Sequence, residues 1–406
     1  HTHFDMPAGA ISTADDFASG TQAAAAGGTT TVIDFVNPER GEPLADALAA
    51  WHRRAAGQAV VDYGFHMTLS EFDGRVAREM ADTVGAGIPT FKCFQAYKGR
   101  LMLGDDLLLR AFAAARELGA AVLVHAENGD MVEFMAARLR AEGRLDPSAH
   151  PALHPALAED EATERALALA ALTGTALHIV HVSTAGAVAA IRRARARGQA
   201  VTAETCPHYL VLDASRYEVG AEDDPFHAAR FTMSPPLRGR GDQAALWAGI
   251  ADGTLGGVTT DHCSFLYRGH KDRGCDDVTR IPNGIPGVFE RMTVLWTAGV
   301  ASGRINPNDF VRLTATGPAK MFGLWPRKGS LAVGADGDLV LWDPRRAGTV
   351  TNAAIPHRAD YSAYEGFAYT GGPAVVLRRG EIIARDGRYV GTGGGGEFVP
   401  RDAAWP

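Results

Sequence analysis

AVLVH at residues 121–125 is a short apolar run that ends on a histidine, and it follows a helical stretch at residues 105–118. The same alternation of β-rich runs with Ala/Leu/Arg-rich helical stretches, such as residues 185–197, continues along most of the chain. This alternation predicts βα units that form a parallel sheet. We expect strands at residues 31–36, 61–67, 89–94, 121–125, 176–182, 200–205 and 257–261.

Side chains that can bind metal ions stand where several of these strands end and at the start of the chain. They are His1, His3, Lys92, His125, His181 and Asp261. Because alternate residues of a strand point to the same side, His1 and His3 can offer both rings to one ion. Imidazole and carboxylate groups are common ligands of zinc-like cations. The joint pattern predicts a two-metal hydrolase site, although a single strand-end histidine is more often a hydrogen-bonded core residue.

The seven expected strands are one fewer than a (β/α)8 barrel requires. We therefore expect a TIM-like barrel whose first strand lies just before His1, outside this numbering, so that the N-terminal strands are missing from this chain. In such barrels the catalytic groups lie at the carboxyl ends of the strands, which would bring all six candidate ligands to one mouth. After about Trp325 the sequence changes to short alternating runs with Asp-Gly turns, which predict a small β domain. The expected domains are therefore a barrel at residues 1–325 and a β part with a tail at residues 326–406.

Composition and charge favour a soluble protein that acts on a small molecule. The formal net charge is −7, so no basic surface for nucleic acid is indicated. No apolar run is long enough to cross a membrane, and the start of the chain does not resemble a signal peptide, so we expect a cytoplasmic location. The cysteines at positions 93, 206, 263 and 275 form no Cys-x-x-Cys pair, which suits a reducing compartment.

Ten motifs along the chain carry a specific resemblance to a known family. They are HTHFDMP, TFKCFQAYKG, VHAENGD, HVST, ETCPHYL, MSPPLR, TTDHCSF, IPNGIPG, KGSLAVGADGDLVLWDP and DYSAYEGF, running nearly from end to end. In this order they resemble the dihydropyrimidinase and hydantoinase branch of the amidohydrolase superfamily. The resemblance implies a distorted (β/α)8 barrel beside a small β-sandwich. It also implies hydrolysis of the cyclic amide bond of dihydropyrimidines and 5-substituted hydantoins to N-carbamoyl amino acids.

The resemblance assigns the six candidate ligands to two divalent metal ions, of which Zn²⁺ is the first expectation and Mn²⁺ the alternative. It implies that Lys92 is carboxylated, giving an N6-carboxylysine that bridges the two ions. A hydroxide shared by the ions would attack the amide carbon. Asp261 is expected to move the proton to the ring nitrogen, and the hydroxyl of Tyr97 is expected to stabilise the oxyanion.

The resemblance also indicates how the substrate is held. Ser234 in MSPPLR and Asn283 in IPNGIPG match positions where relatives bind the ring amide or imide through backbone groups. Lid segments should form the pocket for the ring substituent, with Ala8, Phe94, Leu101 and Met102 as its expected lining. Relatives are usually homotetramers, so a homo-oligomer is expected.

Other functions remain open at this stage. Allantoinase and dihydroorotase are the nearest catalytic alternatives, and a non-catalytic dihydropyrimidinase-like scaffold protein is a third. Cys263 beside His262 would suit a thiol hydrolase, but the six metal ligands would then have no use. His208 and His262 are not assigned as ligands, because packing or support of the ligands is the commoner role.

Overall fold

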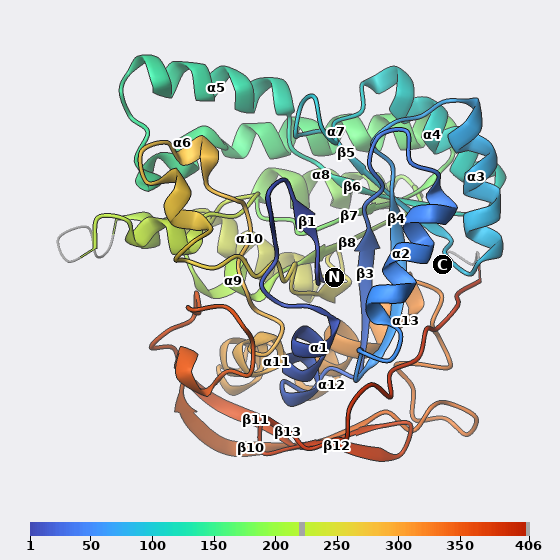
Figure 1. Cartoon of the computed structure of the whole chain (residues 1–406), viewed down its shortest axis with the longest axis vertical. Helices are drawn as coiled ribbons and strands as arrows, with labels where there is room; N and C mark the ends of the chain where they lie inside the picture. The colour runs from blue at the N-terminus through green and yellow to red at the C-terminus, as the bar shows by residue number, and fades with distance from the viewer. Residues whose placement is uncertain (219–223, 403–406) are drawn as a thin grey trace.

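A curved sheet of parallel strands runs through the middle of the molecule (Figure 1). The computed structural model describes residues 1–218 and 224–402. Within these residues the sheet has seven strands, each parallel to the next along the chain. They are β3 (Thr31–Val36), β4 (Asp62–Thr68), β5 (Thr90–Phe94), β6 (Ala121–His125), β7 (Ala176–Ile179), β8 (Val201–Thr205) and β9 (Gly257–Val258). The expected TIM-like barrel is thus confirmed as a seven-stranded curved sheet with helices around it.

Helices follow the strands and cover the outside of the sheet (Figure 1). They are α1 (Phe17–Ala26), α2 (Leu44–Ala55), α3 (Gly74–Gly85), α4 (Asp105–Glu117), α5 (Gly129–Ala141), α6 (His150–Leu153), α7 (Ala156–Thr173), α8 (Ala185–Ala196), α9 (Pro207–Val211), α10 (Arg240–Ala251), α11 (Arg291–Leu295), α12 (Pro307–Val311) and α13 (Gly317–Met321). Short 3-10 turns are η1 (Pro147–Ala149), η2 (Ala214–Tyr217), η3 (His227–Phe231), η4 (Lys271–Gly274), η5 (Val278–Arg280) and η8 (Asn352–Ala354), and π-helical turns are η6 (Trp296–Ala301) and η7 (Arg312–Thr316).

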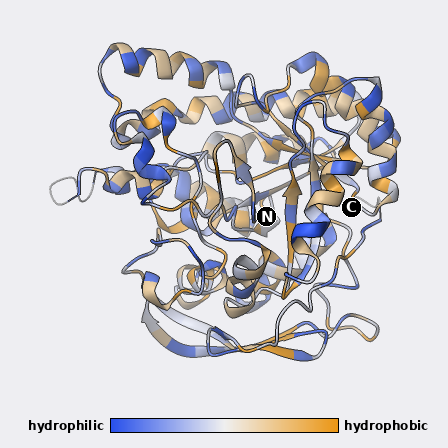
Figure 2. Cartoon of the chain, viewed as in Figure 1, coloured by the Kyte–Doolittle hydropathy of each residue, from blue (hydrophilic) through white to orange (hydrophobic). Residues whose placement is uncertain are grey.

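The outer helices are amphipathic, which explains why they form against the sheet. In α4 the buried residues Leu108, Ala111, Phe112 and Ala115 recur at the spacing of one helical face. Figure 2 shows hydrophilic and hydrophobic residues alternating around the helices at the edge of the molecule. Among the described residues no helix combines the length and the apolar character that a membrane crossing requires.

The first residues of the chain lie between the two outer strands of the sheet. Thr2 makes parallel bridges with both Asp34 in β3 and His262, which follows β9. The Thr2 hydroxyl also donates a 2.7 Å hydrogen bond to the Asp34 carboxylate. His1 and His3 are thereby held at the carboxyl ends of the strands, as the sequence predicted.

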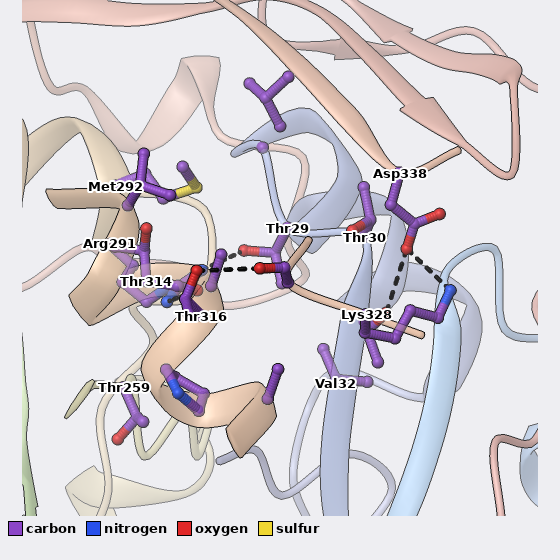
Figure 3. Close-up of a pocket in the computed structure, with 18 of the residues that line it drawn as sticks. Thr29, Thr30, Val32, Thr259, Arg291, Met292, Thr314, Thr316, Lys328 and Asp338 are labelled. Carbon is purple, nitrogen blue, oxygen red and sulfur yellow. Dashed lines mark hydrogen bonds and ion pairs between the residues drawn. The ribbon is translucent and has the colours of Figure 1, made fainter. Parts of the chain in front are cut away.

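A groove of about 800 Å³ lies between β3 and the segment that follows β9. Thr29 and Thr30 line one side, and Arg291 and Thr314 line another (Figure 3). The Arg291 guanidinium spans this groove, because it donates to the Val258 carbonyl at 3.1 Å and to the Thr29 hydroxyl at 3.0 Å.

A second sheet is built from the C-terminal part of the chain. It is antiparallel and contains β10 (Leu339–Thr349), β11 (Ala368–Arg378), β12 (Glu381–Arg385) and β13 (Arg388–Tyr389). It lies below α1 and α11 in Figure 1. A small hairpin, β1 (Pro7–Ala8) and β2 (Ile11–Ser12), extends from the N-terminal segment. The β-rich region expected after the barrel is therefore present, whereas the domain boundary at residues 325 and 326 stays a prediction, and residues 403–406 lie outside the described part.

Three expected strand ends need correction. β7 ends at Ile179 rather than at residue 182, and β9 ends at Val258 rather than at residue 261. The backbone is left-handed at His181 (φ 39°) and at Asp261 (φ 48°), so neither residue continues a strand. Lys92 lies in the middle of β5 instead of at its end.

Candidate metal centre and substrate-binding groups

His1, His3 and Asp261 form the first cluster of candidate ligands. One ligand atom from each residue lies within 4.8 Å of the others. The Nε2 atoms of His1 and His3 are each 3.1 Å from the same carboxylate oxygen, Oδ1 of Asp261. Burial would raise the pKa of the Asp261 carboxyl, but the two histidines hold it well below its usual range. Asp261 is therefore an anion to which two imidazoles point.

His125 and His181 form a second cluster beside the first. His125 Nδ1, at the end of β6, lies 2.9 Å from Nε2 of His181, which stands two residues after β7. The ring of His181 is 5.9 Å from that of His1, so the two clusters adjoin. Burial lowers the pKa of both His125 and His181, which favours the neutral imidazole that can bind a metal ion.

Lys92 is buried beside these clusters, with only 1% of its surface exposed. Its Nζ lies 5.0 Å from the centres of both the Phe35 and the Phe94 rings. Burial lowers the pKa of Lys92 to about 8, although the negative charges of Asp261 and Glu204 oppose this change. A neutral amine is therefore accessible near neutral pH.

Two buried glutamates support the histidine ligands. Glu204 at the end of β8 accepts a 2.6 Å hydrogen bond from His1 Nδ1. Glu127, two residues after β6, lies 3.5 Å from His125 Nε2. A carboxylate on the second nitrogen of a ligating histidine fixes the tautomer and orientation of the ring. Sequence reasoning missed both, although they stand in the motifs VHAENGD and ETCPHYL and Glu127 follows His125 at a spacing of two.

The three predicted substrate-binding residues meet at the same mouth. The Tyr97 hydroxyl lies beside the side chains of Ser234 and Asn283, and burial holds its pKa above the usual range. The ring of Tyr97 is 5.3 Å from that of the candidate ligand His125. The Ser234 hydroxyl donates a 2.6 Å hydrogen bond to Glu127. These contacts join the expected substrate groups to the metal-ligand clusters.

Strained backbone gathers at the site. Only a few non-glycine residues of the described chain have a left-handed backbone, and they include Tyr97 (φ 64°), His181 (φ 39°) and Asp261 (φ 48°). Such conformations cost on the order of 1–3 kcal/mol each and persist where surrounding structure enforces them. Such conformations concentrate at functional sites, and here three of the predicted site residues have them.

The expected lid residues come from two segments. Phe94 and Met102 form a parallel bridge, and the Leu103 amide donates a 3.0 Å hydrogen bond to the Phe94 carbonyl, so the turn carrying Leu101 closes back on β5. Ala8 lies on the separate hairpin of β1 and β2.

The unassigned histidines have other surroundings. His262 Nε2 lies 3.1 Å from Asp15, and its Nδ1 accepts hydrogen bonds from the amides of Gly287 and Val288. His262 therefore supports the mouth without belonging to the ligand clusters. Burial lowers the pKa of His208 to about 4.

The donor set of His1, His3 and Asp261 fits a divalent cation. The Nδ1 of His3 is buried and has no hydrogen-bond partner in the described part of the chain, whereas the Nε2 atoms of His1 and His125 face the carboxylates of Asp261 and Glu127 at 3.1 and 3.5 Å. Buried polar atoms are normally satisfied, so an imidazole left in this state beside an ionised carboxylate indicates a ligand-binding role.

Three comparisons show what the chain is similar to. Residues 1–383 match the model of the amidohydrolase family. A D-hydantoinase from Geobacillus stearothermophilus is 46% identical over 403 residues, which are 99% of this chain and 84% of that protein. The crystal structure of dihydropyrimidinase from Brevibacillus agri superposes with a TM-score of 0.97 at 44% identity, over 100% of this chain and 88% of that one. The L-hydantoinase (dihydropyrimidinase) of Arthrobacter aurescens gives a TM-score of 0.87 at 28% identity, over 95% of this chain and 84% of that one.

Proposed function

This chain belongs to the dihydropyrimidinase and hydantoinase branch of the amidohydrolase family, and we propose on that premise that it hydrolyses the cyclic amide bond of 5-substituted hydantoins and dihydropyrimidines. The products are N-carbamoyl amino acids. The observation that carries the proposal is the meeting of His1, His3 and Asp261 at the barrel mouth, in a chain that resembles named hydantoinases over nearly its whole length.

Enzymes of this family generally use a binuclear metal centre. In this chain His1, His3 and Asp261 would hold one ion, and His125 and His181 would hold the other. Two such ions, most often Zn²⁺, would supply a nucleophilic water of lowered pKa and polarise the amide carbonyl.

Lys92 completes the ligand set as an N6-carboxylysine. Its neutral amine adds carbon dioxide and releases a proton, which replaces a cation by an anion with two oxygens. The lowered pKa of Lys92, about 8, supports this reaction because a larger fraction of the amine is neutral than in an exposed lysine. The buried place beside Asp261 and His181 suits a group that links the two clusters.

Asp261 acts as the proton carrier. Its carboxylate is held ionised by His1 and His3, so it can accept a proton during attack on the ring. It then delivers that proton to the ring nitrogen as the C–N bond breaks, which makes the amine a leaving group. Its contacts with His1 and His3, each at 3.1 Å, support this role.

The remaining groups orient the ring. The Tyr97 hydroxyl donates to the carbonyl oxygen as negative charge develops there, and its high pKa keeps it protonated for that role. Backbone groups near Ser234 and Asn283 bind the –CO–NH–CO– unit that hydantoins and dihydropyrimidines share. Ala8, Phe94, Leu101 and Met102 line the pocket for the 5-substituent.

The proposal also covers the oligomeric state of the enzyme and its location in the cell. It works as a homo-oligomer, as a tetramer by resemblance, and it resides in the cytoplasm, where the free thiols at positions 93, 206, 263 and 275 stay reduced. Light scattering of the purified protein tests the first of these statements.

One experiment tests the function. Metal content is measured on the purified protein, and ring opening is assayed with dihydrouracil, a 5-substituted hydantoin, allantoin and dihydroorotate. We expect about two metal ions per chain and the highest kcat/KM on hydantoin or dihydrouracil. Preference for allantoin or dihydroorotate would make the protein a different cyclic amidohydrolase. A metal-free protein without activity on any ring would contradict the proposal as a whole.

A further inference from the structure

Lys271 is a buried lysine that lies between the two loops carrying Ser234 and Asn283. It begins the short turn η4 and none of its surface is exposed. Its Nζ donates hydrogen bonds to the Thr232 carbonyl at 2.8 Å and to the Pro282 carbonyl at 3.1 Å. These acceptors stand two residues before Ser234 and one residue before Asn283.

The two loops have few other direct links. The Gly284 amide donates a 3.1 Å hydrogen bond to the same Thr232 carbonyl that Lys271 binds. His150 Nε2 lies 2.7 Å from the carbonyl of the next residue, Met233, which fixes one of the loops from behind. The Thr232 carbonyl is thus a junction at which both loops meet, and it accepts hydrogen bonds from both Lys271 and Gly284.

A lysine in such a place has an energetic cost that needs a reason. Burying an amine away from water is unfavourable unless its N–H groups find acceptors. Burial lowers the pKa of Lys271 to about 7. Because the ammonium and the neutral amine both have at least two N–H donors, both carbonyls remain hydrogen-bonded in either state.

We infer that Lys271 is a positioning residue that fixes the distance between the two substrate-binding loops. The inference rests on the proposed function, because that function gives the loops their role in holding the ring. A ring imide bound by backbone groups of both loops requires a defined separation, and a misplacement of about 1 Å can lower activity by about 100-fold. Two carbonyls bound by one nitrogen atom supply that separation.

The test compares Lys271→Met with Lys328→Met. Lys328 is the control because it is also a buried lysine, with 3% of its surface exposed. It pairs with Asp62 and Asp338 and contacts neither substrate-binding loop. We measure kcat and KM for dihydrouracil and a 5-substituted hydantoin, the metal content, and hydrogen exchange at the amides of Asn283 and Gly284.

Lys271→Met should raise KM for both rings by a similar factor, about tenfold or more, with metal content unchanged. Exchange at Asn283 and Gly284 should become at least about tenfold faster. Lys328→Met should lower the melting temperature and leave KM and these exchange rates unchanged. Lys271→Gln, which keeps an N–H donor, should fall between the parent and Lys271→Met.

Unchanged KM and unchanged exchange in a folded Lys271→Met would overturn the inference. So would failure of both Lys271 variants to fold, because Lys271 would then be needed for folding rather than for positioning. A parent protein inactive on both rings would instead contradict the proposed function, and the exchange rates would still decide whether Lys271 holds the loops.

Discussion

The Ser234 hydroxyl donates a 2.6 Å hydrogen bond to the buried carboxylate of Glu127, which makes Glu127 a link between two parts of the site. The oxygen that accepts this bond, Oε2, also lies 3.5 Å from Nε2 of the candidate ligand His125, and the other oxygen, Oε1, lies 2.9 Å from Nδ1 of His154. Burial would raise the pKa of the Glu127 carboxyl, but the neighbouring histidines hold it well below its usual range. Glu127 is therefore ionised, and its carboxylate orients both His125 and the loop that carries Ser234.

Glu127→Gln should weaken both metal binding and catalysis. The amide keeps the shape of the side chain but removes the charge that His125 and His154 face, and replacing such an outer partner typically costs about 10–100-fold in metal affinity or activity. We expect a loss of this size in kcat/KM together with weaker metal retention during dialysis. Glu142→Gln is the control, because Glu142 is exposed just after α5 and pairs with Arg138. A variant that keeps full activity and full metal content would show that Glu127 does not orient the site.

Lys92→Ala should lose metal and activity together. A ligand that bridges two ions contributes more than an outer-shell partner, so we expect a fall in activity of at least about 100-fold. A short carboxylic acid such as propionate should restore part of the activity by replacing the missing carboxylate. Metal analysis and hydantoin hydrolysis with and without propionate check this. Lys98→Ala is the control, since Lys98 is exposed and pairs with Asp130. Retention of two ions per chain in Lys92→Ala would rule out the bridge.

Ala8→Phe should change substrate preference. Ala8 lies on the β1–β2 hairpin, and its small side chain is expected to leave room for an apolar 5-substituent. Filling that room should lower kcat/KM for bulky hydantoins more than for dihydrouracil, by about 1–3 kcal/mol or roughly 10–200-fold. Ala10→Phe, at an exposed position of the same hairpin, should leave the ratio unchanged. Equal effects on the two substrates would remove Ala8 from the pocket.

Asp15 should stabilise the fold in a pH-dependent manner. Burial would raise the pKa of its carboxyl, but hydrogen bonds from His262, the Arg358 amide and Ser19 lower it well below the usual range. A carboxyl with a lower pKa in the folded state contributes stability above its unfolded pKa, about 3.9, and loses it as the pH falls toward the folded value. Asp15→Asn should therefore cost about 1–3 kcal/mol at pH 7.

The difference between the Asp15→Asn variant and the parent should shrink as the pH falls below about 4. Urea unfolding of the metal-depleted proteins between pH 7 and pH 3.5 measures it, and Asp106→Asn on the exposed first turn of α4 is the control. A difference that grows on acidification would have the wrong sign for an ionised Asp15.

The sequence allowed most strands to be predicted, and candidate ligands at their ends to be named, because both depend on short-range patterns. β3 and β6 begin and end where the apolar runs do, at residues 31–36 and 121–125. A buried parallel strand must be apolar on both faces, so its ends are visible in the sequence. His125 was found in this way, at the carboxyl end of such a run.

Other features depend on tertiary structure and could not be predicted. The expected ends at residues 182 and 261 were too late, because His181 and Asp261 adopt a left-handed backbone that only the surrounding mouth enforces. Lys271 has no local signal, since the carbonyls that it binds belong to residues 232 and 282. Glu127 could have been noticed from its spacing to His125, but not its contact with Ser234, which is 107 residues away.

The left-handed backbone at Tyr97, His181 and Asp261 has a consequence for any effort to make this protein more heat-resistant. Glycine adopts this conformation without steric conflict, so glycine at any of the three positions would relieve strain in the native state. A screen that scores survival on heating alone would tend to enrich such replacements and would return proteins without a working centre. Selection should therefore combine heating with turnover, because a replacement that relieves backbone strain at one of these positions also removes a side chain of the proposed centre.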